Sequence, residues 1–409
     1  MTMPWGDPTA FPTVPFRRVF RPIRRPVPPE AEVVTAYTDG VVTLRSNRRL
    51  DGYHEAQDLS TYQGVEPGDF VVHGLDILRG SVGVSDSAGA MSPVCNVLQA
   101  IGNHNPYYHA YVIQAQAASG LTRALARGIR EGGADFRRWE TLAELPLLAP
   151  PAELQDQIVY FLDREIQRID EILEQIDRLR ELVNQRLESI TDVEMFGRTE
   201  CTYLTPRLSD IADIRPSGVD KNSREGDVPV ELCNYTDVYK NMFITSSLDL
   251  MDSTATASEV TRLSLRAHDV VMTKDSETAD DIGIPAVVSE DLPVVVLGYH
   301  CALLRPRPGT WGPFLYWLMR SRAVRSEWEV AARGVTRVGL RQEDVAHLRV
   351  QVPESEAVQQ EIAERLFDAA EKSAAAIEEL LRLQALLTER RQALITAAVT
   401  GQVDIEAVV

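Results

Sequence analysis

The chain has 409 residues, of which 44% are hydrophobic and 25% are charged. This length is enough for two ordinary hydrophobic cores, and no stretch approaches the roughly 18 uncharged apolar residues of a transmembrane helix. The formal net charge of −18 argues against a uniformly basic nucleic-acid-binding protein, so the distribution of charge along the chain matters more than its sum.

The start of the chain and its cysteines indicate an intracellular protein. Residues 1–15 are polar and interrupted by proline, unlike the basic and then apolar stretches of a signal peptide. Cys95, Cys201, Cys233 and Cys301 lie far apart, so the sequence predicts neither a disulfide framework nor a zinc site. We therefore expect a cytoplasmic protein with reduced, mostly buried cysteines.

Residues 1–149 have the mixture of short strands and helix that is typical of an α+β domain. They begin with an arm rich in proline and arginine, residues 12–29. The sequence leaves two roles open for its arginines: contacts along a DNA phosphate backbone, or keeping a flexible tail in solution. Strands are predicted at 32–36, 41–44 and 70–73, and a helix at 107–127.

Residues 150–200 predict one long helix. Apolar residues recur every seven positions in a coiled-coil-like seam, as at Ile169 and Ile176. Some 45 helical residues span on the order of 65 Å. Further apolar residues such as Ile172 and Leu179 widen the stripe beyond a two-helix seam, which leaves room for helices from other chains.

The second half of the chain repeats the first. Tyr37-Thr38-Asp39 recurs as Tyr235-Thr236-Asp237, and Arg127-Gly128 recurs as Arg333-Gly334. Residues 201–352 again predict an α+β domain, with strands at 228–232, 269–273, 285–288 and 294–297 and a helix at 313–332. Residues 353–409 again predict a long helix. A repeat of this length indicates domain duplication, and the two amphipathic helices are expected to pack on each other antiparallel. The second helix repeats the apolar stripe with Leu380, Leu383 and Leu387.

The acidity belongs to the two helical segments. They carry net charges of −7 and −6, whereas the globular segments carry only −1 and −4. Thirty-eight of the 42 basic residues are arginines, which suits bidentate contacts with phosphate or guanine. A GC-rich genome that favours arginine codons explains this bias equally well.

Both globular segments carry basic clusters beside a glycine-containing loop just before the long helix. Such a loop can aim cations at phosphates and base edges. The alternative is a solvated helix face whose arginines pair with nearby glutamates. The candidate DNA contacts are Arg123, Arg127, Arg130, Arg137 and Arg138 in the first segment, and Arg320, Arg322, Arg325, Arg333, Arg337 and Arg341 in the second, with Arg45, Arg48 and Lys274 as weaker candidates.

No segment predicts catalysis. Asn105-Pro106-Tyr107-Tyr108 approximates the Asn-Pro-Pro-Tyr loop of adenine methyltransferases, but the second proline is missing, and a helix start is the favoured interpretation. The chain has no G-x-x-x-x-G-K-[ST] phosphate loop. Asp275 and the nearby Asp280 and Asp281 are interpreted as an acidic surface loop rather than a metal site. We expect no metal and no cofactor in this chain.

The long helices resemble those of a known family. Gln155-Asp156-Gln157-Ile158 with Phe161-Leu162-Asp163, and the run from Thr388 to Asp404, resemble the helices of type I restriction-modification specificity subunits. The resemblance implies a non-catalytic subunit whose two target-recognition domains read a split double-stranded DNA target. It also implies two methyltransferase subunits that bind S-adenosylmethionine, and restriction subunits that use ATP and Mg²⁺. The methyltransferase helices would dock beside the long helices at Ile169, Ile172, Ile176, Leu179, Leu380, Leu383 and Leu387.

The sequence thus predicts two duplicated α+β domains separated by two long antiparallel coiled-coil-like helices, without membrane association. A coiled-coil scaffold that binds proteins through two globular domains is the main alternative function. A self-contained methyltransferase is a second alternative, and a phage-defence system that methylates without restriction is a third.

Overall fold

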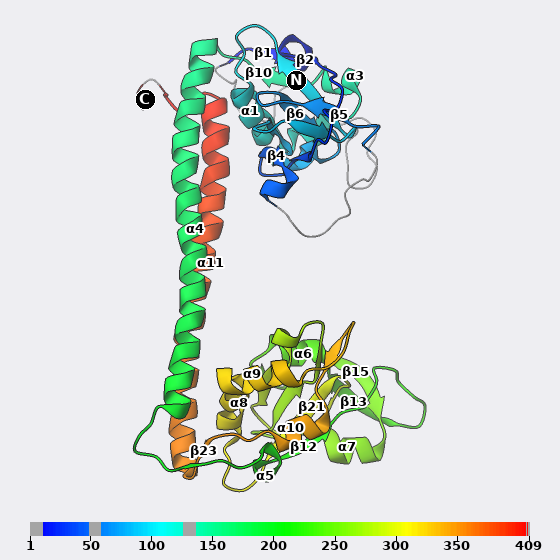
Figure 1. Cartoon of the computed structure of the whole chain (residues 1–409), viewed down its shortest axis with the longest axis vertical. Helices are drawn as coiled ribbons and strands as arrows, with labels where there is room; N and C mark the ends of the chain where they lie inside the picture. The colour runs from blue at the N-terminus through cyan, green and yellow to red at the C-terminus, as the bar shows by residue number, and fades with distance from the viewer. Residues whose placement is uncertain (1–10, 49–58, 126–135, 406, 408–409) are drawn as a thin grey trace. The chain divides into compact units, whose positions relative to one another are not determined.

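The computed structural model describes residues 11–48, 59–125, 136–405 and 407. The chain divides into two compact units: unit 1 comprises Met1–Asp177 with Leu381–Val409, and unit 2 comprises Arg178–Leu380. Each unit combines a β-rich head with parts of two long helices, α4 (Ala152–Phe196) and α11 (Glu356–Val399) (Figure 1). The predicted class, two α+β domains and two long helices, is confirmed.

The head of unit 1 contains two four-stranded sheets and one two-stranded sheet. Their strand orders are β2-β9-β6-β7, β4-β3-β8-β5 and β1-β10, and among these pairs only β3 and β8 run parallel. The strands are β1 (Thr13–Pro15), β2 (Phe20–Pro22), β3 (Val33–Ala36), β4 (Val42–Leu44), β5 (Gln63–Val65), β6 (Phe70–His73), β7 (Val82–Val84), β8 (Gly89–Met91), β9 (Cys95–Ala100) and β10 (Pro146–Leu148). The short helices are α1 (Pro106–Ala118), α2 (Leu121–Leu125) and α3 (Trp139–Leu142).

The head of unit 2 has the orders β12-β21-β17-β19-β14, β15-β13-β20-β16, β11-β23 and β18-β22. Its strands are β11 (Tyr203–Leu204), β12 (Ala212–Pro216), β13 (Val228–Cys233), β14 (Phe243–Ile244), β15 (Met251–Ala255), β16 (Ser264–Leu265), β17 (Val270–Thr273), β18 (Asp275–Ser276), β19 (Pro285–Val288), β20 (Leu292–Leu297), β21 (Cys301–Pro306), β22 (Val338–Gly339) and β23 (Val352–Pro353). The short helices are α5 (Leu208–Ile211), α6 (Tyr235–Lys240), α7 (Ala257–Leu263), α8 (Gly312–Arg320), α9 (Arg322–Ala331) and α10 (Gln342–His347).

The two heads share one topology. The order β2-β9-β6-β7 of unit 1 reappears in unit 2 as β12-β21-β17-β19, and β4-β3-β8-β5 reappears as β15-β13-β20-β16. The parallel pair stands at the same place in both, β3 with β8 and β13 with β20. Unit 2 adds β14 and the small β18-β22 ladder. This correspondence supports the duplication that the repeated sequence indicates.

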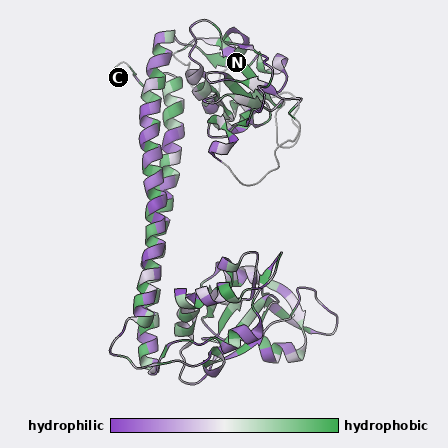
Figure 2. Cartoon of the chain, viewed as in Figure 1, coloured by the Kyte–Doolittle hydropathy of each residue, from purple (hydrophilic) through white to green (hydrophobic). Residues whose placement is uncertain are grey.

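Alternating side chains divide each head into layers. On β6, Phe70 and Val72 join the core that contains α1 and the long helices, whereas Val71 joins the core between the two larger sheets. On β17, Met272 and Val271 divide in the same way. The hydropathy colouring shows these apolar strands within both heads and mixed polarity along the long helices (Figure 2). Both faces of each central sheet are therefore buried.

The long helices run antiparallel in both units. In unit 1, Asp170 of α4 lies 3.7 Å from Arg391 of α11. In unit 2, Glu194 of α4 lies 3.7 Å from Arg365 of α11, near the opposite end of each helix. The predicted antiparallel pairing is confirmed, because early residues of α4 meet late residues of α11 and the reverse.

Two helix predictions are wrong, and one of the two alternatives for the arm is excluded. The arm does not form a solvated tail, because Phe16 and Phe20 are fully buried and β1 pairs with β10. The helix predicted at 107–127 ends at Ala118, since Gly120 adopts a left-handed conformation with φ of 76°. The helix predicted at 313–332 breaks at Ser321, whose hydroxyl accepts a hydrogen bond from Val324 N–H and caps α9.

Three of the four cysteines are buried, as the sequence predicts. Cys95, Cys233 and Cys301 are buried free thiols, and burial raises the pKa of Cys95 and of Cys301 to about 12. Within the described residues, every helix is too short or too polar to cross a lipid bilayer.

Candidate nucleic-acid interface

Four charged or titratable side chains of unit 2 meet where β17 ends and β21 begins. Arg337 Nη1 lies 3.4 Å from His300 Nε2, and His300 Nδ1 lies 2.5 Å from Asp275 Oδ2. Lys274 Nζ lies 3.6 Å from the same carboxylate oxygen. We call Lys274, Asp275, His300 and Arg337 the relay cluster. It carries two permanent positive charges against one carboxylate.

The geometry of the relay cluster fixes the tautomer of its histidine. A guanidinium can only donate hydrogen bonds, so His300 Nε2 accepts from Arg337. The proton of the neutral ring is then on Nδ1, which donates to Asp275. His300 itself has a positive φ of 71°, and its N–H group and side chain stand at the turn between β20 and β21.

A short ladder and a tight hairpin carry the arginine. β18 pairs with β22, so that Asp275 stands opposite Gly339 and Ser276 opposite Val338. Arg333 and Gly339 exchange backbone hydrogen bonds of 3.2 and 3.0 Å and close the loop between them. Gly334 has φ of 151°, and a Cβ there would lie 1.9 Å from the Arg337 carbonyl oxygen. Glycine is therefore needed for this loop to close.

Two stacked tyrosines extend the site along α6. The rings of Tyr235 and Tyr239 are 5.7 Å apart and nearly parallel, and Tyr239 donates to Asp281 at 3.0 Å. Burial raises the pKa of Tyr235, and the charge of Arg337 acts in the opposite direction. Tyr239 and Tyr299 are both more than 40% exposed, as aromatic groups that contact nucleic acid must be.

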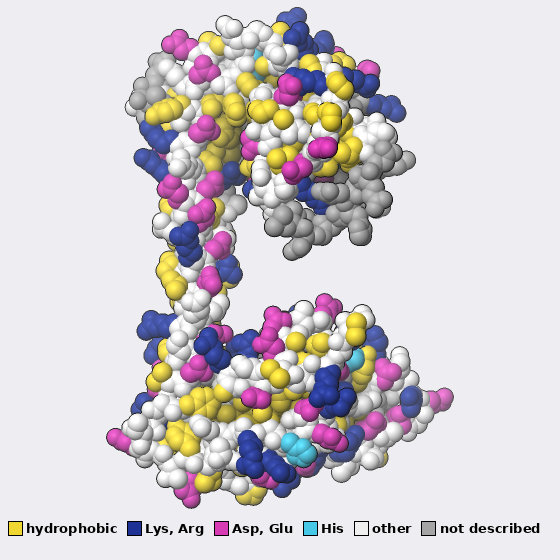
Figure 3. Space-filling model, in the orientation of Figure 1, with side chains coloured by type: hydrophobic (Ala, Val, Ile, Leu, Met, Phe, Trp, Pro, Cys, Tyr) yellow, Lys and Arg dark blue, Asp and Glu magenta, His cyan; other side chains and the backbone are white. Residues whose placement is uncertain are grey.

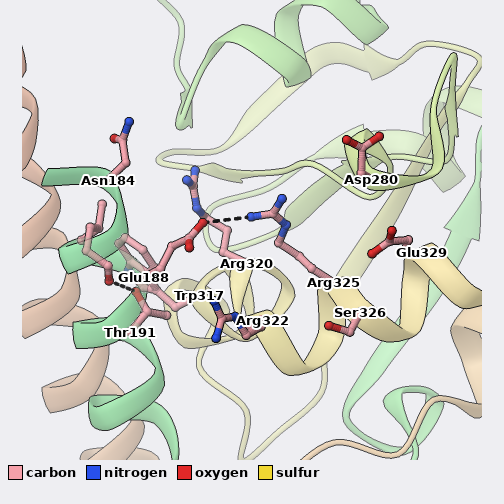
Figure 4. Close-up of a pocket in the computed structure, with 11 residues that line it drawn as sticks. Asn184, Glu188, Thr191, Asp280, Trp317, Arg320, Arg322, Arg325, Ser326 and Glu329 are labelled. Atoms are coloured by element: carbon pink, nitrogen blue, oxygen red, sulfur yellow. Dashed lines mark hydrogen bonds and ion pairs between the residues drawn. The ribbon is translucent and has the colours of Figure 1, made fainter. Parts of the chain in front are cut away.

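A groove lies on the other side of Tyr239, between α4 and the helices α8 and α9 (Figure 4). Three arginines line it, together with the carboxylates of Glu188, Asp280 and Glu329. Its volume is about 460 Å³. Arg325 pairs with Glu188 of α4 at 3.4 Å, and Arg320 donates to the Tyr316 hydroxyl at 3.0 Å. The Arg320 guanidinium also lies 5.8 Å from the centre of the Trp317 ring. Arg320, Arg322 and Arg325 are exposed and line one groove, as the sequence repeat suggested for a contact cluster.

Unit 1 has an arginine beside the equivalent tyrosine. The Arg48 guanidinium lies 4.9 Å from the centre of the Tyr37 ring, and Arg48 Nη2 lies 2.6 Å from Asp39 Oδ2. Burial raises the pKa of Asp39, but hydrogen bonds from Arg48 and from Val41 N–H outweigh it and leave this pKa below its usual value. Asp39 therefore stays ionised and holds Arg48 against Tyr37.

The other predicted contacts are placed more loosely. Arg123 on α2, Arg137 just before α3, and Arg341 just before α10 are exposed, and Arg45 at the end of β4 is half-buried. Gly74, which aligns with Lys274, packs against Arg137 so closely that a Cβ would lie 2.7 Å from Arg137 Cγ. Arg127 and Arg130 lie outside the described residues. These residues remain predicted contacts.

Equivalent buried glutamines connect each head to its long helix. Gln155 Oε1 accepts from Asn105 N–H at 2.8 Å, and Gln359 Oε1 accepts from Trp311 N–H at 2.9 Å. The Nε2 groups donate to the carbonyl oxygens of Pro150 and Pro353. Asn105 caps α1 and Tyr108 is fully buried, so the Asn-Pro-Tyr-Tyr run forms a helix start and not a catalytic loop.

The predicted docking residues on the long helices divide into two groups. Ile169 and Ile176 are only 5% and 2% exposed, because the chain itself buries them, so they stabilise the helix pair and do not face a partner. Leu380 and Leu387 are half-buried. Hydrophobic side chains do remain exposed along the paired helices (Figure 3), among them Ile172, Leu179, Leu182, Leu381, Leu383 and Leu386.

Sequence reasoning missed His300 and the roles of Tyr235 and Asp275 in the site. Lys274 and His300 lie beside the paired residues Thr273 and Cys301 of neighbouring strands. Pairing the two runs that end and begin at these positions would have placed His300 beside Lys274. The repeated Tyr-Thr-Asp motif was a second signal, since it places Tyr37 and Tyr235 at equivalent points of the two heads.

Comparison with known proteins identifies the fold. No family model matches the sequence, and no curated protein matches it closely. A chain from a structure on complex assembly and conformational transition of the type I R-M system aligns with 97% of this chain and 100% of its own length, with a TM-score of 0.72 and 15% identity. The HsdS subunit from Thermoanaerobacter tengcongensis aligns with 98% and 100%, with a TM-score of 0.52 and 16% identity. This chain therefore shares the fold of these type I R-M proteins over nearly its whole length.

Proposed function

We propose that this chain is the DNA-sequence specificity subunit of a type I restriction-modification complex or of a related phage-defence complex. Residues 1–149 and 201–352 form two target-recognition domains, each of which reads one half of a split double-stranded target. The helical segments 150–200 and 353–409 set the unspecified gap between the halves. The chain itself is non-catalytic.

One observation carries the proposal most strongly. Both heads repeat the same strand order, and each presents an arginine held by neighbouring side chains, Arg48 over the Tyr37 ring in unit 1 and Arg337 against His300 in unit 2. Two heads of one topology suit two half-sites. Exposed arginines and tyrosines are the residues that bind phosphates and base edges.

The division of labour within each head follows from the positions of these groups. The groove with Arg320 and Arg325 supplies cations for phosphates, which give affinity that falls steeply with salt. The relay cluster and its hairpin enter the major groove and supply contacts to base edges, which give specificity. The helical segments, with net charges of −7 and −6, also repel DNA and so favour its binding at the heads.

Partner subunits dock on the long helices. Ile172, Leu179 and Leu383 are 41%, 48% and 41% exposed, and exposed apolar side chains on long helices are typical of helix-docking surfaces. Two methyltransferase subunits bind there and supply S-adenosylmethionine, and restriction subunits supply ATP-driven, Mg²⁺-dependent cleavage. The complex acts on DNA in the cytoplasm.

Sequencing of modified bases in a host that carries the whole operon tests the proposal. We expect one bipartite methylated motif. Removing one heptad from α4 and the matching heptad from α11 shortens the helices by about 10 Å, or roughly three base pairs, so the gap should change while both half-motifs persist. Altered half-motifs would contradict the assignment of roles. A complex that retards DNA without salt dependence, or not at all, would favour a protein-binding scaffold instead.

A further inference from the structure

The relay cluster holds one arginine in a defined position. Arg337 is exposed and lies on the hairpin between Arg333 and Gly339, which Gly334 allows to close. Val335 on the same hairpin is fully exposed, so the hairpin projects into solvent. Its Nη1 donates to His300 Nε2, whose opposite ring nitrogen is fixed by Asp275. An exposed arginine normally loses several rotamers when it binds, so an arginine that is already held binds with a smaller entropic cost.

The contact leaves one edge of the guanidinium free. An arginine has five N–H donors on a planar fork, and His300 occupies only one of those on Nη1. The edge formed by Nε and Nη2 remains open for a second partner. This edge matches the O6 and N7 acceptors of guanine in the major groove, the commonest bidentate base contact that arginine makes.

The neighbours of Arg337 favour a base rather than a phosphate. The carboxylate of the relay cluster, Asp275, is engaged by His300 and by Lys274, and Arg337 contacts the histidine ring on its other side. The ring of Tyr299 lies 3.4 Å from that of His300, centre to centre, and is exposed. A fixed donor pair next to aromatic rings gives directional recognition, whereas phosphate contacts need only a mobile cation.

We propose that the half-site read by unit 2 contains a guanine, that Arg337 reads it through its Nε–Nη2 edge, and that His300 and Asp275 position this arginine. The inference rests on the proposed function, since it names the base that this head recognises. Arg48 of unit 1 is held differently, by direct pairing with Asp39, so the inference concerns unit 2 alone.

The test uses the full complex and the methylated motif of the wild-type operon. Arg337→Lys keeps the charge and loses the bidentate edge, so a guanine in one half-motif should become degenerate while the other half-motif is unchanged. Arg307→Lys is the matched control, because this exposed arginine of the same head belongs neither to the relay cluster nor to the arginine groove, and both half-motifs should persist. His300→Asn introduces a residue that also tolerates a positive φ, and it removes the imidazole ring that connects Arg337 to Asp275.

Binding measurements supply the second readout. Replacing the assigned guanine by 7-deazaguanine, which lacks the N7 acceptor, should weaken binding of the wild-type complex roughly tenfold and binding of the Arg337→Lys complex hardly at all. His300→Asn should show an intermediate loss. Two results would overturn the inference: a unit 2 half-motif without guanine, or an Arg337→Lys complex that still discriminates against 7-deazaguanine. A wild-type complex without any bipartite motif would instead overturn the proposed function.

Discussion

The buried glutamines allow a strong prediction about stability. Gln359 is fully buried, accepts a hydrogen bond from Trp311 N–H at 2.9 Å, and donates to Gly309 and Pro353 carbonyl oxygens at 3.0 and 2.9 Å. Gln359→Met keeps the length of the side chain and removes all three bonds. An unpaired buried polar group costs about 1–3 kcal/mol, so the free energy of unfolding of unit 2 should fall by about 3–5 kcal/mol.

Urea unfolding followed by tryptophan fluorescence measures this change. Three of the five tryptophans, Trp311, Trp317 and Trp328, belong to unit 2, so the signal reports mainly on that unit. Gln360→Met is the matched control on the next position of α11, and it should change the free energy by less than about 0.5 kcal/mol. If Gln359→Met were as stable as the control variant, the glutamine would not hold the head to the helix.

Three further predictions follow from burial and charge. If Arg333 contacts a phosphate, Arg333→Ala should reduce the slope of log affinity against log salt concentration by about one. It should weaken binding to specific and random DNA duplexes equally, as measured by fluorescence anisotropy. Weaker binding to the specific duplex alone would indicate a base contact instead. Ile176→Ala should lower the free energy of unfolding by about 2–4 kcal/mol in urea, because this side chain is buried. Leu179→Ala should leave stability nearly unchanged and weaken methyltransferase binding in pull-down titrations, because this side chain is exposed. Equal effects of the two variants on stability would contradict the division between buried and exposed residues. Burial lowers the pKa of His109 to about 3, so below about pH 6.5 the unfolded chain binds a proton that the folded unit 1 does not. The free energy of unfolding of unit 1 should therefore fall by about 2 kcal/mol between pH 6.5 and pH 5 because of this group. In urea unfolding at several pH values, His109→Phe should remove that part of the pH dependence.

The long helices and several strands could be predicted because one physical signal dominates each of them. The heptad seam predicts both long helices, and α4 lies within residues 150–200 and α11 within residues 353–409. Runs of β-branched residues place β6 and β19 at the predicted positions. β9, by contrast, could not be predicted from its sequence, Cys-Asn-Val-Leu-Gln-Ala. Val97 and Leu98 are buried in two different cores on opposite faces of the strand, so apolar and polar residues do not alternate along it.

The site was predictable only in part. The repeat indicated Arg333 and Arg337, because both copies carry a basic loop at the same distance from the long helix. His300 was not predictable from its neighbours, since it meets Arg337 across 37 residues through a strand pairing and a left-handed turn. The burial of Ile169 and Ile176 depends on which stripe of α4 faces α11, which the heptad pattern leaves open when the stripe is wide.

The division of the chain into units has a consequence for synthesis on the ribosome. Unit 2 is one continuous stretch, whereas the core of unit 1 includes Ile395 and Val399, and the Tyr108 hydroxyl donates to the Val399 carbonyl oxygen. At about 5–20 residues per second, roughly 250 further residues must be translated before the first head meets these late side chains, a delay on the order of 10–50 s. The head made first is therefore completed last, and a nascent chain interrupted after residue 380 would leave its apolar surface open to chaperones and aggregation.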